Sequence, residues 1–433
     1  MRSNSYSIKD TIIIGLMLFA LFLGAGNLIF PPALGQAAGT NVSFAIIGFL
    51  ITGVGLPILA ILAIAKSGGD LQKVSSNVGT LFSIFFPLAV YLAIGPLFGI
   101  PRTGSVAYEI GLLPYLESTS TFTLFIFTFA FFGVSFWLSL NPSKLVNRIG
   151  KLLTPIIIGI LLLLTVVGII KPMGSLNLPS PEYVQYSFFK GFQEGYFTMD
   201  AIASLVFGIV VITRMRERGI HTLEDTKKKA IQVGLIAGLG LIFVYLSLAY
   251  LGATSIDSIG YLDNGGAILA NISNHLLGFA GLILLSIVIT IACLTTSVGL
   301  ISAFGEFIQR TIPAIPYPVT TGTIALFSFA MANMGLNQLI QFSLPMLMML
   351  YPIAIVLIIL TLCKDLLRLN KGSFQGGVIG AAIVSIPDGL SQTTIFSDVF
   401  LPFMQWLPFG HLGIGWIIPA IFGTLLGKVF TKK

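Results

Sequence analysis

Two stretches of this sequence place glycine and polar side chains inside long apolar runs. The stretch GAGNLIFPP (24–32) contains Gly24 and Asn27, and the stretch GFQEGYFTMDAIASLVFG (191–208) contains Asp200. Glycine and proline weaken a helix, and backbone that leaves the helix exposes N–H and C=O groups that can bind an anion or a cation. Both stretches are therefore candidate binding sites. In the first stretch, Pro31 and Pro32 are expected to restart the helix after the break.

A third stretch, IACLTTSVGL (291–300), offers oxygen ligands for a cation. Thr295 and Thr296 are adjacent, and Ala292 lies three residues before them. Two neighbouring hydroxyls and a carbonyl released upstream would supply three oxygens. The alternative, that these hydroxyls bond to their own helix or to a neighbouring helix, is favoured when the stretch is taken alone.

The composition sets the class of protein that must position these residues. Of 433 residues 55% are hydrophobic and 9% are charged, and the mean hydropathy is +0.97. The chain is therefore expected to be an all-α, multi-pass membrane protein, since apolar runs of about 20 residues, enough to cross a bilayer, recur along it. The expected runs are 11–36, 41–65, 79–106, 122–140, 152–170, 190–213, 230–251, 275–309, 318–333, 337–361, 376–395 and 407–427.

The basic residues indicate the orientation. If the N-terminus is cytoplasmic, 20 of the 23 Lys and Arg residues fall on the cytoplasmic side, Lys171 and Lys190 fall outside, and Arg102 stays in the third run. Positively charged loops resist translocation, so both termini are predicted to be cytoplasmic. The same distribution argues against a nucleic-acid-binding surface, which would gather its basic residues on one face.

The interrupted runs are the first and the sixth, five runs apart. A repeat of five spans must enter the membrane from the opposite side in its second copy, and a broken helix in matching positions of two inverted repeats is typical of secondary transporters. We expect one transmembrane domain (1–433) with about 12 helices: a first repeat (11–170), an inverted second repeat (190–361) and two additional helices (376–427).

Ionisable residues at membrane depth are the next candidates, because they are costly there unless they face a cavity. Asp200 is the hardest to explain structurally, and Glu194 and Arg102 are kept with it as possible coupling or gating groups. A charge at the membrane interface near a helix end is the favoured interpretation of four residues: Arg102, Glu109, Glu306 and Asp388.

Three stretches, 21–39, 194–208 and 292–300, resemble the signature stretches of the bacterial branched-chain amino acid carrier family, the BrnQ or LIVCS type. The resemblance covers essentially the whole chain. It implies a symporter of the cytoplasmic membrane that imports leucine, isoleucine and valine with Na⁺, or in some members with H⁺.

A more distant likeness connects the residues to roles. GAGN (24–27) is similar to the Gly-x-Gly-Asn of the first span of the neurotransmitter:sodium symporters, and YFTMD (196–200) is similar to their sixth-span motif, which implies a LeuT-like fold. The likeness implies that amides near Gly24, Ala25 and Gly26 hold the substrate carboxylate. It also implies a sodium site from the Ala20, Leu23 and Ala292 carbonyls and the Thr295 and Thr296 hydroxyls, and a second one at Asn27 and Thr198.

The departures from that distant family narrow these expectations. Its second sodium site draws an Asn from the seventh span, which run 230–251 lacks, so one ion per turnover is expected. Asp200 stands where the relatives have Ser, and it could pair with the substrate ammonium or carry a coupling proton. For Tyr196 and Phe197, ordinary packing and a role in walling the substrate pocket are evenly balanced.

Other classes of function fit less well. The three histidines are scattered, which argues against a metal-dependent membrane enzyme, and no filter-like repeat indicates a channel. The expected partners are an amino acid, Na⁺ or H⁺ and membrane lipid, with no cofactor besides the coupling ion and no obligate protein partner. A proton-coupled permease of the same fold remains the alternative.

Overall fold

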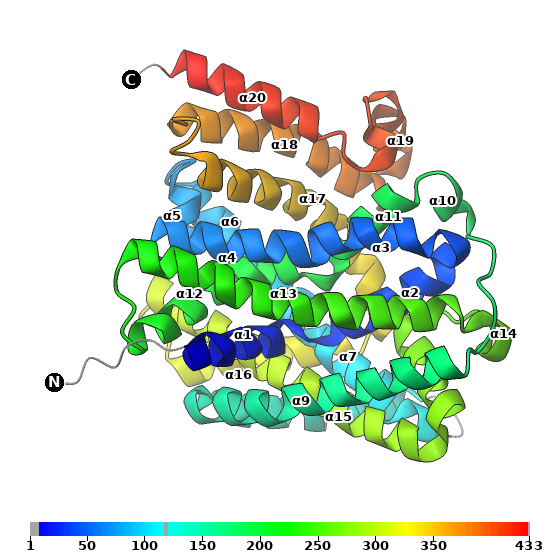
Figure 1. Cartoon of the computed structure of the whole chain (residues 1–433). Coiled ribbons are helices and arrows are strands. Elements are labelled where there is room, and N and C mark those ends of the chain that lie inside the picture. Colours follow the sequence, from blue (N-terminus) through cyan, green and yellow to red (C-terminus); the bar gives the residue numbers. More distant parts are fainter. Residues whose placement is uncertain (1–7, 117–119, 432–433) are drawn as a thin grey trace.

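The computed structural model describes residues 8–116 and 120–431, with no side-chain description for 142–154. Every secondary-structure element among the described residues is a helix, packed in one bundle (Figure 1). The helices of the first half are α1 (Ile8–Phe22), α2 (Ala25–Ala38), η1 (Gly39–Asn41), α3 (Val42–Leu50), η2 (Ile51–Gly55), α4 (Leu56–Ser67), α5 (Leu71–Ser76), α6 (Phe82–Leu92), η3 (Ala93–Leu97), α7 (Gly99–Gly111), η4 (Leu113–Tyr115), α8 (Thr121–Ser139) and α9 (Pro142–Ile170). Those of the second half are α10 (Pro181–Val184), α11 (Ser187–Glu194), η5 (Gly195–Thr198), α12 (Asp200–Glu217), α13 (Leu223–Ala253), α14 (Ile256–Ile259), α15 (Gly265–Thr311), α16 (Tyr317–Ala332), α17 (Leu336–Cys363), α18 (Lys371–Ser391), α19 (Ser397–Trp406), η6 (Gly410–Leu412) and α20 (Ile417–Phe430).

The first apolar run is broken, as its sequence predicts. α1 ends at Phe22 and α2 begins at Ala25, with Gly24 in an extended conformation between them (φ −113°, ψ −162°). Pro31 and Pro32 lie inside α2, so the prediction that they restart the helix is wrong. Inside the helix each proline leaves the carbonyl four residues earlier without its usual donor, because a proline has no N–H.

The sixth run is also broken. α11 continues as the 3₁₀ turn η5, Met199 adopts a left-handed conformation (φ 64°), and α12 begins at Asp200. The two parts are bent by 41°. A non-glycine residue at positive φ is strained, and such strain is common where a backbone is shaped for function.

A third break, which the sequence analysis did not predict, separates α6 from α7. Gly95 lies inside the π-helical turn η3 with non-helical angles (φ −87°, ψ −125°), and Pro96 follows it. π-helical turns inside helices are frequent at functional sites. Here the break directs the start of α7 toward the other two breaks.

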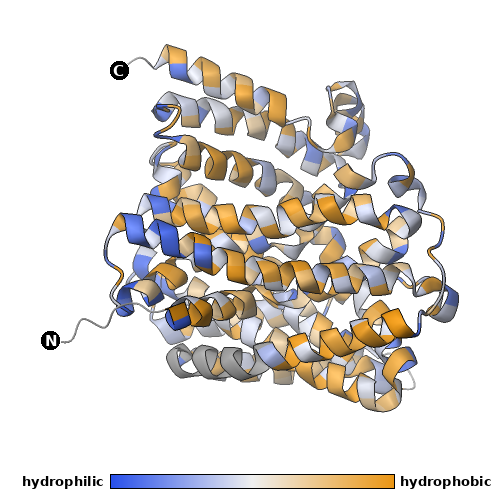
Figure 2. Cartoon of the chain, in the orientation of Figure 1, coloured by the Kyte–Doolittle hydropathy of each residue, from blue (hydrophilic) through white to orange (hydrophobic). Residues whose placement is uncertain are grey.

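The apolar character of the helices fits a membrane protein. Six helical segments are long and apolar enough to span a bilayer, the bent pair of α11–η5 and α12 makes a seventh, and three more helices are apolar but shorter. Hydrophobic residues predominate along the long helices (Figure 2), and many of them are exposed, such as Trp137 of α8 at 69%. The number of crossings, about 12, stays a prediction. The last apolar helix begins at Ile417, after a segment that turns at the left-handed residues Phe409 and Gly413.

Helix ends that were predicted to be cytoplasmic lie together on one face. Arg218 after α12 pairs with Asp10 of α1, and Lys66 of α4 pairs with Asp365 after α17 at 2.9 Å. α1 begins and α20 ends on this same side, at the left of Figure 1. The terminal residues themselves are outside the described part of the chain.

Small residues bring α2 close to α13. A Cβ built on Gly35 would lie 2.1 Å from the Ala249 carbonyl oxygen, and one on Gly252 would lie 2.1 Å from the Pro32 carbonyl oxygen. Such contacts are typical of membrane helices, in which small residues let backbones approach. This packing positions the first turn of α2 beside the middle of α13.

Candidate functional site

The three breaks meet at one small cavity of the bundle. Its wall includes the whole GAGN stretch, Thr198 and Asp200 from the sixth run, and Thr296 from α15. Arg102, from the first turn of α7, completes the polar part of the wall. The structure thus brings together predicted site residues that are as much as 272 positions apart in the sequence.

Asp200 is the centre of a buried hydrogen-bond cluster. Its side chain is 2% exposed, and its Oδ2 accepts from the Tyr245 hydroxyl at 2.6 Å and from Asn27 Nδ2 at 2.6 Å. Asn27 Nδ2 also contacts the Tyr245 oxygen. A buried carboxylate is costly unless it is hydrogen-bonded, so these two donors explain how Asp200 is tolerated at this depth.

Both polar atoms of the Asn27 side chain form hydrogen bonds within this cluster. While its amide nitrogen faces Asp200, its Oδ1 accepts from the Gly24 N–H at 3.1 Å. The Gly24 amide also approaches the Phe22 carbonyl at 2.6 Å, so it is engaged before any ligand arrives. Of the three amides predicted to hold the carboxylate, those of Ala25 and Gly26 remain at the start of α2.

The first and second breaks touch each other directly. A Cβ on Gly26 would lie 3.1 Å from Thr198 Cα and 3.2 Å from the carbonyl oxygens of Phe197 and Thr198. Glycine is therefore needed at position 26 so that the two unwound segments can approach. The Thr198 hydroxyl donates to the Gly195 carbonyl at 2.9 Å, which fixes the η5 turn.

The two hydroxyls of α15 have different surroundings. Thr295 is half-buried and donates to the Ala292 carbonyl at 2.8 Å, within its own helix. Thr296 is 8% exposed, its hydroxyl has no partner among the described residues, and it lines the cavity. Its Oγ1 would lie 3.2 Å from a Cβ on Gly24, so this free hydroxyl contacts the first break. Ala20 lies near the end of α1, and Leu23 lies in this break. The predicted sodium site of five residues, Ala20, Leu23, Ala292, Thr295 and Thr296, stays a prediction.

Arg102 is in the interior, not at an interface. Its side chain is 2% exposed, and it donates from Nη1 to the Phe197 carbonyl at 2.6 Å and from Nη2 to Ser343 Oγ at 2.9 Å. The interfacial interpretation of Arg102 is therefore wrong, because the break before α7 places the residue inside the bundle. Glu306, by contrast, is half-exposed and pairs with Arg310 at 3.6 Å near the end of α15.

The remaining predicted residues lie outside the cavity wall. Tyr196 stacks on Tyr351 of α17 with ring centroids 4.4 Å apart, and the Phe197 ring packs on Phe30 at 5.4 Å. Glu194 is half-buried at the end of α11. Glu109 is near Asn264, and Asp388 is buried in α18.

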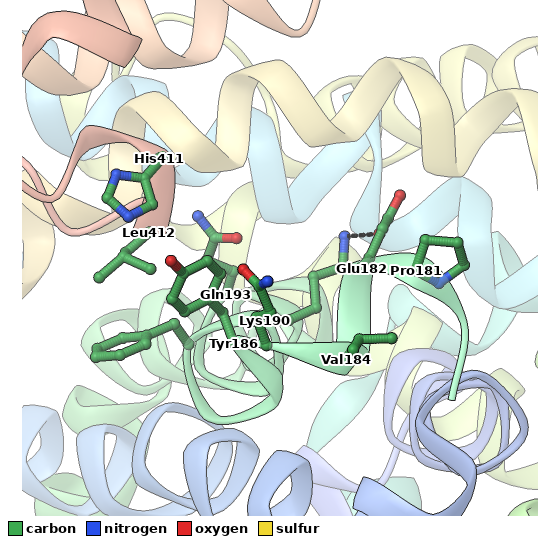
Figure 3. Close-up of a pocket in the computed structure, with 10 residues that line it drawn as sticks. Pro181, Glu182, Val184, Tyr186, Lys190, Gln193, His411 and Leu412 are labelled. Atoms are coloured by element: carbon green, nitrogen blue, oxygen red, sulfur yellow. Dashed lines mark ion pairs between the residues drawn. The ribbon is translucent and has the colours of Figure 1, made fainter. Parts of the chain in front are cut away.

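A second cavity, near the outer ends of α10 and α11, contains none of the predicted site residues. Figure 3 shows its lining, in which Lys190 pairs with Glu182 at 2.5 Å and the Tyr186 ring meets His411 edge-on at 5.4 Å. The lysine is thus already neutralised by its neighbour. Of these two cavities, the first is the one at which broken helices and buried charges converge.

Sequence reasoning missed several groups of the site. Tyr245 of α13 holds Asp200 and Asn27, and Ser343 of α17 holds Arg102. A single Tyr or Ser in an apolar span carries no local signal of such a contact. The third break did have a signal, since AIGPLFGIPRTG (93–104) is as rich in glycine and proline as the first stretch.

Comparisons with known proteins agree with this architecture. A family model described as branched-chain amino acid transport protein matches residues 7–433. The branched-chain amino acid permease BraB of Bacillus subtilis is 48% identical over an alignment of 433 positions, which covers 99% of this chain and 97% of the relative.

Solved structures show a related fold. A nucleobase-cation-symport-1 family transporter, in a closed conformation with bromovinylhydantoin bound, matches with a TM-score of 0.62 and 12% identity over 97% of this chain and 92% of that chain. MhsT in complex with L-phenylalanine matches with a TM-score of 0.60 and 14% identity over 96% of this chain and 98% of that chain. The cavity at the meeting point of broken helices and the match along the chain lead to one conclusion: the protein belongs to the branched-chain amino acid transport protein family, whose members are transporters and not enzymes.

Proposed function

We propose that this protein imports branched-chain amino acids, leucine, isoleucine and valine, together with Na⁺. The substrate class rests on the family and on the relative BraB, which is named as a branched-chain amino acid permease. The geometry is compatible with this class, because the cavity combines polar groups at the helix breaks with apolar walls from residues such as Phe207 and Leu300.

The single observation that carries the Na⁺ assignment is the unpaired hydroxyl of Thr296 against the first break. A buried hydroxyl without a partner costs free energy, and a bound cation would satisfy it. Unwound backbone beside it can add carbonyl ligands, as in secondary transporters with broken helices. We assign the carbonyls of Ala20, Leu23 and Ala292 and the hydroxyls of Thr295 and Thr296 to this site.

The proton-coupled alternative is favoured by a different observation. Asp200 is a buried carboxylate that lines the same cavity and is held by neutral donors only. Such a group can take up a proton on one side of the membrane and release it on the other. Asp200 can equally serve Na⁺-coupled transport as the partner of the substrate ammonium.

Transport would follow the alternating-access scheme of inverted repeats. In this proposal the chain crosses the cytoplasmic membrane about 12 times with both termini inside, and 11–170 and 190–361 form the two repeats. The breaks in the first and sixth spans, five spans apart, and the common polar face of the predicted cytoplasmic ends support this arrangement.

The test is leucine uptake into vesicles containing the purified protein. We expect uptake driven by an inward Na⁺ gradient at constant pH, and a rise in the Na⁺ concentration for half-maximal uptake when Thr296 is replaced by Ala. Uptake that follows an imposed pH gradient and ignores Na⁺ would refute the sodium assignment and support the proton-coupled alternative. A protein that transports no branched-chain amino acid under either gradient would refute the proposed function.

Asp200→Asn separates a working carboxylate from a bystander. We expect this variant to lose uptake, while Asp398→Asn, at an exposed position of α19, keeps it. Normal uptake by Asp200→Asn would leave Asp200 without a role in either coupling mechanism.

A further inference from the structure

Arg102 enters the cavity because the third break directs it there. α7 begins at Gly99, directly after the Gly95 break, and Arg102 lies in its first turn. Ile94, Gly99 and Arg102 all line the cavity together with the start of α2 and Asp200. The guanidinium thus belongs to the same space as the predicted substrate groups.

The contacts of Arg102 leave its charge without compensation. The guanidinium donates to a backbone carbonyl and to a serine hydroxyl, and it lies 5.2 Å from the centroid of the Phe30 ring. Within the described part of the chain no carboxylate lies within 4.0 Å of it, and its Nε has no hydrogen-bond partner. An unpaired buried cation is strongly unfavourable, so an anion that enters the cavity gains by pairing with it.

Asp200 is the acidic group of the same cavity, and it is not paired with Arg102. Neutral donors, Tyr245 and Asn27, hold its carboxylate. The cavity therefore presents one buried cation and one buried carboxyl group that do not pair with each other. A zwitterion offers a carboxylate to the first group and an ammonium donor to the second, so one small ligand can compensate both.

We propose that Arg102 binds the carboxylate of the transported amino acid, opposite Asp200, so that the cavity selects a zwitterion. This inference rests on the proposed function. The Phe197 carbonyl that accepts from Arg102 lies 3.2 Å from the Cβ position of Gly26, so the guanidinium reaches the start of α2. A carboxylate bound there also meets the amides of Ala25 and Gly26 and the positive end of the helix dipole.

The arrangement predicts that a ligand without a carboxylate binds more weakly than leucine. Leucinamide keeps the ammonium group and the side chain of leucine but has a neutral amide in place of the carboxylate. It would meet Arg102 without a partner for that charge and would bind weakly. The guanidinium carries the full charge in this discrimination, so its removal should greatly reduce the preference for leucine over leucinamide.

The experiment measures the dissociation constants of leucine and leucinamide by calorimetric titration of the purified protein in lipid nanodiscs at saturating Na⁺. We expect Arg102→Gln to weaken leucine binding by about 100-fold, the typical loss when one partner of a buried hydrogen-bonded charge pair is removed. The preference for leucine over leucinamide should then fall by about the same factor. Arg216→Gln, an exposed arginine at the end of α12, is the matched control and should keep both constants.

Two results would overturn the inference: an unchanged leucine-to-leucinamide ratio in Arg102→Gln, or a wild-type protein that binds the two ligands equally. If Arg102→Gln does not fold, Arg102→Lys decides. Lysine keeps the charge and loses the forked geometry, so we expect leucine to bind about tenfold more weakly, and unchanged binding of both ligands would overturn the inference. A wild-type protein that binds no leucine contradicts the proposed function itself, which is a separate outcome.

Discussion

Adding one methyl group at Gly24 tests whether the first break and the α15 hydroxyls form one ion site. Gly24 is extended (φ −113°, ψ −162°), a conformation that alanine also adopts. The backbone therefore tolerates Gly24→Ala, and any effect must come from packing. The new Cβ would lie 3.0 Å from Thr296 Cγ2 and 3.2 Å from Thr296 Oγ1.

The expected magnitude follows from these distances. Carbon atoms pack best at about 3.5 to 4.0 Å, so a contact of 3.0 Å forces Thr296 to move. Overpacking of this kind typically costs about 1 to 3 kcal/mol. If the cost falls on the ion-bound state, the Na⁺ affinity drops by roughly 5- to 150-fold, since about 1.4 kcal/mol corresponds to a factor of ten.

The assay is leucine uptake as a function of Na⁺ concentration for four proteins: wild type, Gly24→Ala, Thr296→Ser and the double variant. Thr296→Ser removes the methyl group that clashes and keeps the hydroxyl. We expect it to have little effect alone and to restore Na⁺ affinity in the Gly24→Ala background, a coupling of about 0.5 to 3 kcal/mol.

The control is Gly133→Ala in α8, where an added Cβ has no atom within 4 Å and should leave the Na⁺ dependence unchanged. If the effects of Gly24→Ala and Thr296→Ser simply add, the two residues do not share a site. The same conclusion follows if Gly24→Ala changes the leucine constant and leaves the Na⁺ constant as it was.

Two further predictions concern single hydrogen bonds. Tyr245→Phe removes a donor to the Asp200 carboxylate, which should cost about 1.5 to 3 kcal/mol of stability. We expect a lower unfolding midpoint for this variant than for the control Tyr250→Phe. Equal midpoints would contradict the prediction. The Ser175 backbone N–H and hydroxyl hold the pKa of the Asp257 carboxyl below the 3.8 of an unperturbed aspartate, so this contact stabilises the loop at neutral pH and is lost only as the pH falls through the lowered pKa. Hydrogen exchange at the Ser175 amide should therefore show protection that persists down to about pH 4 and disappears in Asp257→Ala, which has no acceptor. Equal protection in wild type and variant would contradict the assignment.

The sequence allowed the first two breaks to be predicted because their cause is local. Gly24 and Gly26 weaken the helix where they stand, and the polar content of residues 194–200 has the same effect in the sixth run. The position at which the helix resumes was predicted less well. The sequence predicts that Pro31 and Pro32 begin the second half-helix, but they lie inside α2. A helix can continue through prolines when neighbouring groups or water donate hydrogen bonds to the carbonyls that the prolines leave free.

The contacts between distant residues could not be predicted in the same way. The partners of Asp200 and Arg102 include Tyr245 and Ser343, which are 45 and 241 positions away from them. Which turn of α13 faces which turn of α2 depends on close packing at Gly35 and Gly252, and no single residue reports it. The burial of Arg102 was missed for a related reason, since its depth depends on the break at Gly95.

The contacts across the cavity also suggest what ligand binding must do to them. The Arg102 contact with the Phe197 carbonyl and the Asn27 contact with Asp200 both join different helices that line the cavity. A large movement of α12 relative to α2 and α7 would strain these bonds, because they involve the first residue of α12 and the turn before it. An amino acid that offers its carboxylate to Arg102 and its ammonium to Asp200 replaces them with bonds to a small ligand. The binding energy of the substrate is then available to release the direct connections between the helices, which links occupancy of the cavity to movement of the broken spans.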